Sequence, residues 1–215
     1  MRGRIIRGVG GLYTVRGEDG QAHVLRARGR FRREGLTPLV GDLALFSPGQ
    51  GEEHGWLDEI LPRKTESVRP PAANLSLMLL VIAPEPAPDL LLIDRLLVFA
   101  QQSGYGAVVC VNKCDLEAGL ADALQKAYAP SGFSVLGVSA LTGEGLSALG
   151  EKMRGELCCL AGQSAVGKST LLNALCGLDL KTGELSERIR RGKHTTRHAE
   201  LLEANGFSVL DTPGF

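Results

Sequence analysis

A glycine-rich segment at residues 162–170 has the composition of a phosphate-binding loop. It reads Gly-Gln-Ser-Ala-Val-Gly-Lys-Ser-Thr and fits the pattern G-x-x-x-x-G-K-[ST]. Glycines let backbone N–H groups close around phosphates, and the lysine and serine of this pattern reach the β- and γ-phosphates and Mg²⁺. Lys168 is therefore a predicted catalytic group and Ser169 a predicted metal ligand. The predicted phosphate-binding residues are Gly162, Gln163, Ser164, Ala165, Val166, Gly167, Lys168, Ser169 and Thr170.

The four residues at 112–115, Asn-Lys-Cys-Asp, have the side chains that recognise a guanine base. The carboxylate of Asp115 can accept hydrogen bonds from both the N1–H and the exocyclic amine of guanine, a pair that adenine does not offer. A wrong base would leave that carboxylate unpaired, which is a strong basis for rejection. We expect Lys113 to lie along the base and a backbone N–H at Ser139-Ala140 to lie near the guanine O6. The predicted base-binding residues are Asn112, Lys113, Asp115, Ser139 and Ala140.

Residues 211–214, Asp-Thr-Pro-Gly, are typical of a segment that senses Mg²⁺ and the γ-phosphate. Asp211 would hold the metal through a water, and the N–H of Gly214 would contact the phosphate. Residues 187–198 carry arginines, a glycine and paired threonines, which predicts a switch segment in which Thr196 contacts Mg²⁺ as a catalytic and metal-binding group. An ordinary basic surface loop is the alternative interpretation.

Phe215 stands where many GTPases have a glutamine that orients the attacking water. An apolar side chain can neither donate nor accept a hydrogen bond, so another group must position the water. His194 and His198 are the nearest candidates in the sequence, and His194, beside Thr195, is the predicted catalytic residue. A solvated loop histidine is the alternative.

These motifs occur in an unusual order, because the base-reading segments precede the phosphate loop and the Asp211 segment comes last. In an ordinary GTPase the phosphate loop comes first. A circular permutation produces the observed order, and it is tolerated where the termini of the original domain lie close together. The sequence therefore predicts a circularly permuted P-loop GTPase domain that binds GTP or GDP with Mg²⁺. An ATP-dependent nucleic-acid enzyme is disfavoured by Asp115 and by the lack of helicase-like motifs.

The elements that must position these motifs follow from the hydrophobic pattern of residues 75–215. Apolar strands alternate there with helical stretches, which predicts an α/β domain with a mostly parallel sheet. Every motif follows the carboxyl end of a strand, where such sheets bind ligands. Strands are expected at 77–83, 107–111, 133–138, 157–161 and 207–210, and helices at 89–103, 117–128, 144–154 and 168–176.

Residues 1–66 have the pattern of a small β-barrel, with short strands separated by glycine turns. An OB-fold is the commonest five-stranded barrel that binds nucleic acid, and an SH3-like barrel is the alternative. Tyr13, Phe31 and Trp56 belong to the core or offer stacking faces to unpaired bases. Residues 67–74 contain two adjacent prolines and are expected to be a linker. The expected strands are 4–9, 11–16, 22–28, 42–46 and 55–60.

Charge is distributed unevenly along a chain whose formal net charge is zero. Residues 1–33 hold nine arginines and two acidic residues, a local charge of +7. Such asymmetry points to a polyanionic partner, with a solvated basic face as the alternative. The five cysteines lack zinc-ligand spacing and are interpreted as reduced thiols of a cytoplasmic protein. The longest apolar run is too short to span a bilayer, so no membrane association is expected.

The chain resembles the circularly permuted, ribosome small-subunit-dependent GTPases of bacteria. The resemblance covers nearly its whole length. It implies an OB-fold that binds RNA, GTP hydrolysis stimulated by the 30S subunit, contact with 16S rRNA, and a role in late maturation of that subunit; we expect a monomer. The matching segments are 30–33, 40–42, 69–74, 112–115, 162–170, 192–197 and 211–215.

Members of that family continue into a C-terminal zinc-binding domain, whereas this chain stops at Phe215. We therefore expect an incomplete GTPase domain that binds nucleotide poorly and hydrolyses it slowly, with Zn²⁺ only in the part that is absent. The alternative to an enzyme is an rRNA-binding module in which GTP sets the affinity for RNA and hydrolysis is incidental.

Overall fold

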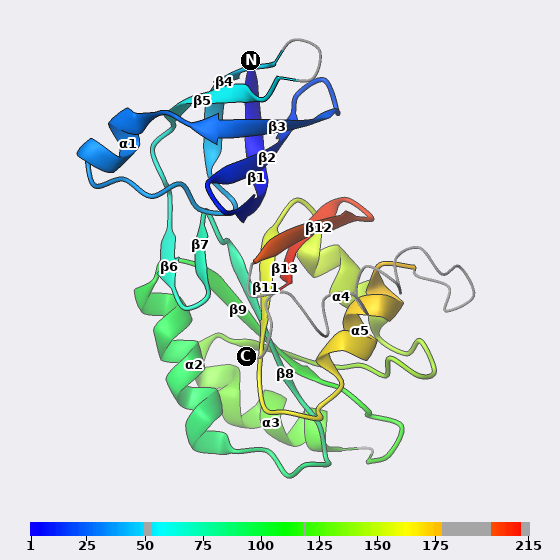
Figure 1. Cartoon of the computed structure of the whole chain (residues 1–215). Coiled ribbons are helices and arrows are strands. Elements are labelled where there is room, and N and C mark those ends of the chain that lie inside the picture. The colour runs from blue at the N-terminus through cyan, green and yellow to red at the C-terminus, as the bar shows by residue number, and fades with distance from the viewer. Residues whose placement is uncertain (50–52, 118, 178–198, 212–215) are drawn as a thin grey trace. The chain divides into compact units, whose positions relative to one another are not determined.

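The computed structural model describes residues 1–49, 53–117, 119–177 and 199–211 (Figure 1). These residues divide into two compact units, one built mainly from Met1–Leu75 and the other mainly from Ser76 onward. The expected division was a barrel at 1–66, a linker at 67–74 and a GTPase domain at 75–215. Each unit is described separately below.

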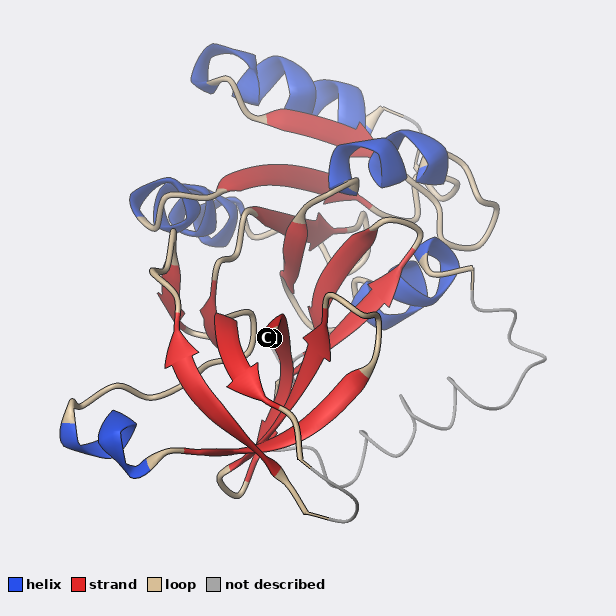
Figure 2. Cartoon of the chain, turned by 90° about the horizontal axis from the view of Figure 1, so that it is seen from above, coloured by secondary structure: helices blue, strands red, loops and turns tan. Residues whose placement is uncertain are grey.

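The first unit is a closed five-stranded barrel. Strands β1, β2 and β3 form an antiparallel meander, β3 pairs in parallel with β5, and β4 pairs antiparallel with both β5 and β1. A short helix α1 (Gly29–Arg33) connects β3 to β4. Figure 2 shows the strands of the barrel curving around a common interior. The expected OB-fold is confirmed. The strands are β1 (Arg2–Val9), β2 (Leu12–Gly17), β3 (Ala22–Ala27), β4 (Leu43–Ser47) and β5 (Gly55–Ile60).

The barrel interior is filled by apolar side chains that alternate along the strands with outward-facing ones. This alternation follows from the two-residue period of a strand, which sends successive side chains to opposite faces of the sheet. Phe31 of α1 closes the interior, Tyr13 is half-buried, and Trp56 is exposed. The three aromatic side chains therefore differ in role, and Trp56 is not a core residue. The buried cluster consists of Ile5, Val15, Leu25, Phe31, Ala44, Phe46 and Leu57.

Residues 67–74, expected to be a linker, belong to an ordered hairpin of the first unit. Strands β6 (Glu66–Val68) and β7 (Pro71–Ala73) pair antiparallel. Asn74, with a φ of 59°, donates from Nδ2 to the carbonyl of Gly41 at 3.0 Å and accepts from the N–H of Lys64 at 2.9 Å. Gly41 is required at this contact, because a Cβ there would lie 2.0 Å from the carbonyl oxygen of Ala73. The hairpin is thus fastened to the barrel.

The second unit contains a sheet whose parallel strands lie in the order β10-β9-β8-β11. The central strand β8 is buried along its whole length, as expected for a parallel strand covered on both faces. Strand β13 lies beside β11, and β12 lies beside β13. The expected mostly parallel α/β architecture is confirmed. The parallel strands are β8 (Leu77–Ile82), β9 (Gly106–Val111), β10 (Ser134–Gly137) and β11 (Leu157–Ala161). Strands β12 (Glu200–Ala204) and β13 (Phe207–Asp211) are divided between the two units.

Helix α3 begins three residues later and α4 two residues later than the sequence pattern indicated, whereas α5 begins at Lys168 as expected. Gly119, Gly145 and Gly167 have positive φ angles and precede α3, α4 and α5, and a left-handed residue cannot continue a helix toward its N-terminus. Helix α2 begins after Asp89, whose carboxylate accepts from the N–H of Leu92 at 3.0 Å. The elements are α2 (Leu90–Gln102), α3 (Leu120–Tyr128), the 3₁₀ turn η1 (Ala129–Ser131), α4 (Leu146–Met153) and α5 (Lys168–Leu175). In the described part of the chain, every helix falls short of the length and apolarity needed to cross a membrane.

Candidate guanine nucleotide site

The predicted nucleotide-binding segments lie together at one edge of the parallel sheet. Residues 112–115 follow β9, residues 139–140 follow β10, and residues 162–167 connect β11 to α5. Because these strands run parallel and neighbour one another through β8, their carboxyl ends meet at the same edge. The permuted order of the sequence is therefore compatible with a single compact site.

The phosphate loop has a backbone that only glycine can adopt at two positions. Gly162 has a φ of 134°, and a Cβ there would lie 2.0 Å from the carbonyl oxygen of Val81. Gly167 has a φ of 90°, and a Cβ there would lie 2.5 Å from Nδ2 of Asn112. Both glycines therefore allow close approach to neighbouring segments as well as a left-handed backbone. Ala165, between them, also has a positive φ of 66°.

Lys168 is the first residue of α5, and its ammonium group reaches back into the loop. Nζ donates hydrogen bonds to the carbonyl oxygens of Gly162 at 2.8 Å and Gln163 at 2.7 Å. Burial lowers the pKa of this ammonium group below its ordinary value. The lysine is thus held within the loop by backbone carbonyls, where an added phosphate would supply a stronger acceptor.

Asn112 connects three of the predicted segments. Its buried side chain donates from Nδ2 to the carbonyl of Val166 at 2.9 Å, and its Oδ1 accepts from the N–H of Ala140 at 3.2 Å. A buried amide that satisfies donors and acceptors on two separate segments fixes their spacing. The Ala140 N–H, predicted to lie near the guanine O6, donates in this structure to Asn112.

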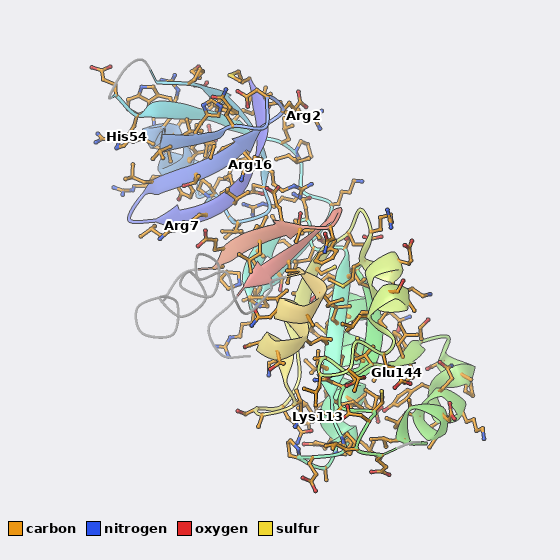
Figure 3. All side chains as sticks on the ribbon, turned by 90° about the vertical axis from the view of Figure 1, so that its right-hand side faces the viewer. Arg2, Arg7, Arg16, His54, Lys113 and Glu144 are labelled. Atoms are coloured by element: carbon orange, nitrogen blue, oxygen red, sulfur yellow. The ribbon has the colours of Figure 1, made fainter. Side chains whose placement is uncertain are left out.

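Lys113 also contacts the phosphate loop, through its side chain. It has a φ of 60°, and Nζ donates to the carbonyl oxygens of Glu85 at 2.7 Å and Ala165 at 3.0 Å. Figure 3 labels its side chain, together with Glu144, on the second unit. The lysine therefore joins the base-reading segment to the phosphate loop and to the loop after β8.

The remaining base-reading residues differ in exposure. Asp115 is exposed, as a group that meets a ligand must be, whereas Ser139 is buried. The Ser139 hydroxyl accepts from the N–H of Thr142 at 3.1 Å, so this serine organises the turn that follows β10. Burial and the nearby Glu144 carboxylate raise the pKa of the Cys114 thiol. Cys114 therefore stays protonated at neutral pH and is no nucleophile.

Two features of the site were not predicted from the sequence. The side chain of Gln163 accepts from the N–H of Asp89 at 3.1 Å and donates to the carbonyl of Ala87 at 3.2 Å, which ties the phosphate loop to the start of α2. Leu116 and Leu141, each directly after a base-reading segment, are 62% and 85% exposed. The sequence did contain a signal for the two leucines. An apolar residue directly after each base-reading segment can offer an apolar surface to a planar base.

The remaining predicted residues lie partly inside and partly outside the described part of the chain. Ser164, Ser169 and Thr170 are exposed and free to meet a ligand. His194, Thr196, His198, Gly214 and Phe215 lie outside the described residues, and only the backbone of Asp211 is described. The groups predicted to hold Mg²⁺ and to orient water, Ser169 included, therefore remain sequence-based predictions.

Two family models together match almost the entire chain. The RsgA N-terminal domain model matches residues 2–57, and the RsgA GTPase model matches residues 60–215. The chain belongs to the RsgA GTPase family. The boundary between the two matches falls within β5, the last strand of the OB-fold barrel. The guanine site described above lies entirely within the match to the RsgA GTPase model.

Related proteins and solved structures agree with this assignment. The small ribosomal subunit biogenesis GTPase RsgA of Ruminiclostridium cellulolyticum is 43% identical over 218 residues, covering 99% of this chain and 72% of the relative. The RsgA protein of Caldanaerobacter subterraneus is also 43% identical, covering 100% of this chain and 74% of the relative.

Two crystal structures share the fold over the whole chain. YjeQ from Thermotoga maritima superposes with a TM-score of 0.80 at 33% identity, covering 100% of this chain and 74% of YjeQ. YloQ, described as a circularly permuted GTPase, superposes with a TM-score of 0.79 at 31% identity and covers 71% of its length. The RsgA family fold therefore includes the permuted motif order.

Proposed function

We propose that this chain is a GTP hydrolase that acts in biogenesis of the small ribosomal subunit. The observation that carries the proposal is the pair of hydrogen-bonding side chains, Asn112 and Lys113, that fasten a guanine-reading segment to the phosphate loop. Family membership supplies the GTPase activity, and the names of the relatives supply the small-subunit assignment.

The proposed mechanism divides the site into base selection and phosphate stabilisation. Asp115 accepts from the two guanine donors, while Lys113 lies along the base and Ala140 contributes its N–H. The loop backbone surrounds the phosphates, and Lys168 stabilises the negative charge that develops on them during transfer. The hydrogen bond that Asn112 donates to Val166 and the one that it accepts from Ala140 hold the base-reading segments and the phosphate loop in register.

The predicted metal ligands Ser169, Thr196 and Asp211 offer two hydroxyl oxygens and one carboxylate, a donor set that suits Mg²⁺. The metal, when bound, would neutralise charge on the β- and γ-phosphates. Among the described residues no cluster of three His, Cys, Asp or Glu side chains could hold a metal ion. The family resemblance implies Zn²⁺ only in a C-terminal domain, outside residues 1–215, and this remains a prediction.

The residue that orients the attacking water is proposed to be His194, because Phe215 cannot form the necessary hydrogen bond. The partner is proposed to be the 30S subunit, contacted through 16S rRNA by the basic barrel. Its nine arginines at residues 1–33 support this, since phosphates attract such a surface at long range. We further propose a monomer that works in the cytoplasm.

The test is GTP turnover by this chain with and without purified small ribosomal subunits. We expect a large stimulation, because the subunit would order the catalytic groups as it binds. A turnover rate that does not change with added subunits, together with tighter RNA binding in the presence of GTP, would favour the RNA-binding module with incidental hydrolysis.

A further inference from the structure

A basic pocket lies on the OB-fold barrel beside α1 and β5. Its volume is about 620 Å³, and it is lined by Arg28, Gly29, Arg30, Arg33 and Trp56. Pockets that hold small ligands have volumes of roughly 300–1,000 Å³. The pocket borders β3, because Arg28 directly follows that strand and Trp56 pairs with Arg26 of it. Its lining combines one planar apolar ring with three guanidinium groups.

Trp56 is available to a ligand, because the barrel does not use it for packing. Its neighbour Leu57 is fully buried in the core, while the Trp56 side chain points to the other face of β5 and is 43% exposed. Phe31 of the adjacent helix is buried and closes the barrel. Trp56 is absent from the buried cluster that fills the barrel, so its indole is accessible to a ligand.

The arginine beside the ring is held in place before any ligand arrives. The Arg28 guanidinium carbon lies 5.3 Å from the centroid of the Trp56 ring. Nε of Arg28 donates to Oδ1 of Asp58 at 2.7 Å, and the hydroxyl of Ser47 donates to Oδ2 at 2.6 Å. Although burial opposes it, hydrogen bonds from Ser47 and Arg28 lower the pKa of Asp58. Asp58 is therefore ionised at neutral pH and fixes Arg28 against the indole.

The other two arginines leave positive charge unbalanced around the ring. Arg30 donates to the backbone carbonyl of Asp58, and its charge contributes to the lowered pKa of that carboxyl, so the three arginines face a single carboxylate. Arg33 is exposed, and no hydrogen bond or ion pair holds it within the part of the chain that the structure describes. Asp58 is the only carboxylate that engages this cluster among the described residues, and Arg28 already pairs with it. Two cations thus remain for an anionic ligand.

We propose that this pocket binds a single unpaired nucleotide of an RNA strand. The base stacks on the indole of Trp56, and the flanking phosphates pair with Arg30 and Arg33. This inference rests on the proposed RNA-binding role of the barrel and adds the site and the form of RNA. A base within a duplex is already stacked on its neighbours and cannot offer its face, whereas an unpaired base can stack on an aromatic side chain. An acidic peptide would use the arginines and leave the ring unused.

Trp56 is the only tryptophan of the chain, so its fluorescence reports on this pocket alone. The full chain is titrated with a short single-stranded oligoadenylate, with an RNA duplex of equal length, and with a polyglutamate peptide. We expect the single strand to quench the fluorescence at concentrations where duplex and peptide do not. Equal quenching by the duplex, or quenching by the peptide alone, would overturn the proposal.

Two substitutions separate stacking from charge, with labelled oligoadenylate binding followed by fluorescence anisotropy. Trp56→Ala should weaken binding by about 5- to 150-fold, the loss expected for one base–aromatic stack, and Trp56→Phe should recover part of it. Arg33→Gln should weaken binding and lower the salt slope by about 0.7. Arg2→Gln is the matched control, because Arg2 lies on the same barrel but outside the pocket lining (Figure 3). It removes the same charge and should change binding less than Arg33→Gln. Parent-like affinity of both Trp56→Ala and Arg33→Gln overturns the proposal.

Two controls keep these outcomes distinct. GDP affinity and the urea midpoint of each variant show whether the chain is folded, and Arg33→Gln tests the proposal independently if Trp56→Ala does not fold. Binding of purified small-subunit RNA is measured in parallel. If the parent and Trp56→Ala bind that RNA and the oligoadenylate equally, the pocket assignment fails while the proposed function stands. If the parent binds no RNA at any salt concentration, the RNA-binding role of the barrel fails as well.

Discussion

Asn112 donates a hydrogen bond from Nδ2 to the carbonyl of Val166 at 2.9 Å, and it thereby joins the guanine-reading segment to the phosphate loop across 54 residues of sequence. The amide is buried, so loss of either partner would leave a polar atom unsatisfied. This hydrogen bond therefore fixes the spacing between the two halves of the site. Gly167 lies directly against the same amide nitrogen, which explains why this position requires glycine.

The first prediction is that Gly167→Ala damages both the fold and nucleotide binding. A Cβ would lie 2.5 Å from Nδ2 of Asn112 and would occupy a left-handed backbone position. The left-handed backbone alone costs about 1–2 kcal/mol for a residue with a Cβ. We expect a lower urea midpoint and at least a tenfold loss of GDP affinity, about 1.4 kcal/mol.

Gly150→Ala is the matched control for that substitution. Gly150 lies within α4, has an ordinary helical φ, and offers open space to a Cβ. Alanine there should stabilise the chain by about 0.5–1 kcal/mol and leave GDP affinity unchanged. If Gly167→Ala behaved like this control, the proposed contact between Gly167 and Asn112 would be wrong.

The second prediction concerns base selectivity at Asp115. Asp115→Asn replaces one acceptor oxygen by a donor, so the preference should shift from guanine toward xanthine nucleotides. Competition binding with GDP, ADP and XDP measures this preference. Glu117→Gln is the control, because it removes the same charge from an exposed position two residues away. If ADP competes as well as GDP against the unmodified chain, the guanine assignment is incorrect.

The third prediction concerns the buried ion pair between Asp42 and Arg63. Two nitrogens of Arg63 donate to the fully buried Asp42 carboxylate at 2.7 and 2.8 Å, and hydrogen bonding to Asp42 raises the pKa of the guanidinium. Removing one partner of a buried pair strands the other charge and costs about 3–5 kcal/mol. Arg63→Met should therefore destabilise the barrel by that amount, measured by urea unfolding with Trp56 fluorescence as the probe.

Arg154→Met serves as its control, because the ion pair between Arg154 and Glu151 is exposed on both sides. An exposed pair contributes about 0–1 kcal/mol, so this variant should unfold close to the parent midpoint. Similar midpoints for the Arg63 and Arg154 variants would mean that the buried pair is dispensable.

The fourth prediction is that the barrel arginines set the salt dependence of RNA binding. Replacing Arg28, Arg30, Arg32 and Arg33 by glutamine should lower the slope of log affinity against log salt by about 2–3, since each lost phosphate contact removes up to 0.9. GDP affinity should stay within about twofold, because distant sites are nearly additive.

A second quadruple variant removes the same charge from exposed positions of the second unit. It carries glutamine at Arg95, Lys126, Lys152 and Arg154. This variant should retain the parent salt slope with small-subunit RNA. Equal slopes for the parent and both variants would remove the barrel from the RNA-binding surface.

The sequence predicted the barrel strands well because a half-buried strand alternates buried and exposed residues, as the observed strand from Leu43 to Ser47 shows beside the expected 42–46. It missed the helix from Gly29 to Arg33, which is too short for a helical period to be visible. It treated residues 67–74 as a linker because of their prolines, whereas Asn74 fastens them to Gly41. That contact spans 33 residues of sequence, and no local pattern indicates it.

The candidate site also combines features that adjacent residues indicate with features that depend on residues far apart in the sequence. The phosphate loop was evident from its spacing of glycines and lysine, a signal carried by adjacent residues. The donation from the Ala140 N–H to Asn112, and the contacts of Gln163 with Ala87 and Asp89, depend on which strands neighbour one another in the sheet. A motif can therefore identify the chemistry, while the hydrogen bonds that hold the motifs together require the structure.

The last prediction separates the positioning of water from the binding of nucleotide. His194→Ala should lower turnover stimulated by small subunits, because Phe215 has no group that could orient the attacking water. Loss of one donor acting in the transition state is worth about 2–4 kcal/mol, or about 30-fold to 1,000-fold in rate. Affinity for a non-hydrolysable GTP analogue should barely change, because the histidine would act mainly in the transition state.

Lys168→Ala provides the contrast, since its ammonium group already lies within the phosphate loop, donating to Gly162 and Gln163. This variant should lose both analogue affinity and turnover, because the lysine contacts phosphate in the ground state as well as in the transition state. Single-turnover hydrolysis on small subunits, measured beside equilibrium binding of the analogue, distinguishes the two patterns. A His194→Ala chain that hydrolyses GTP at the parent rate would refute the assignment and direct attention to His198 or to a group of the ribosome.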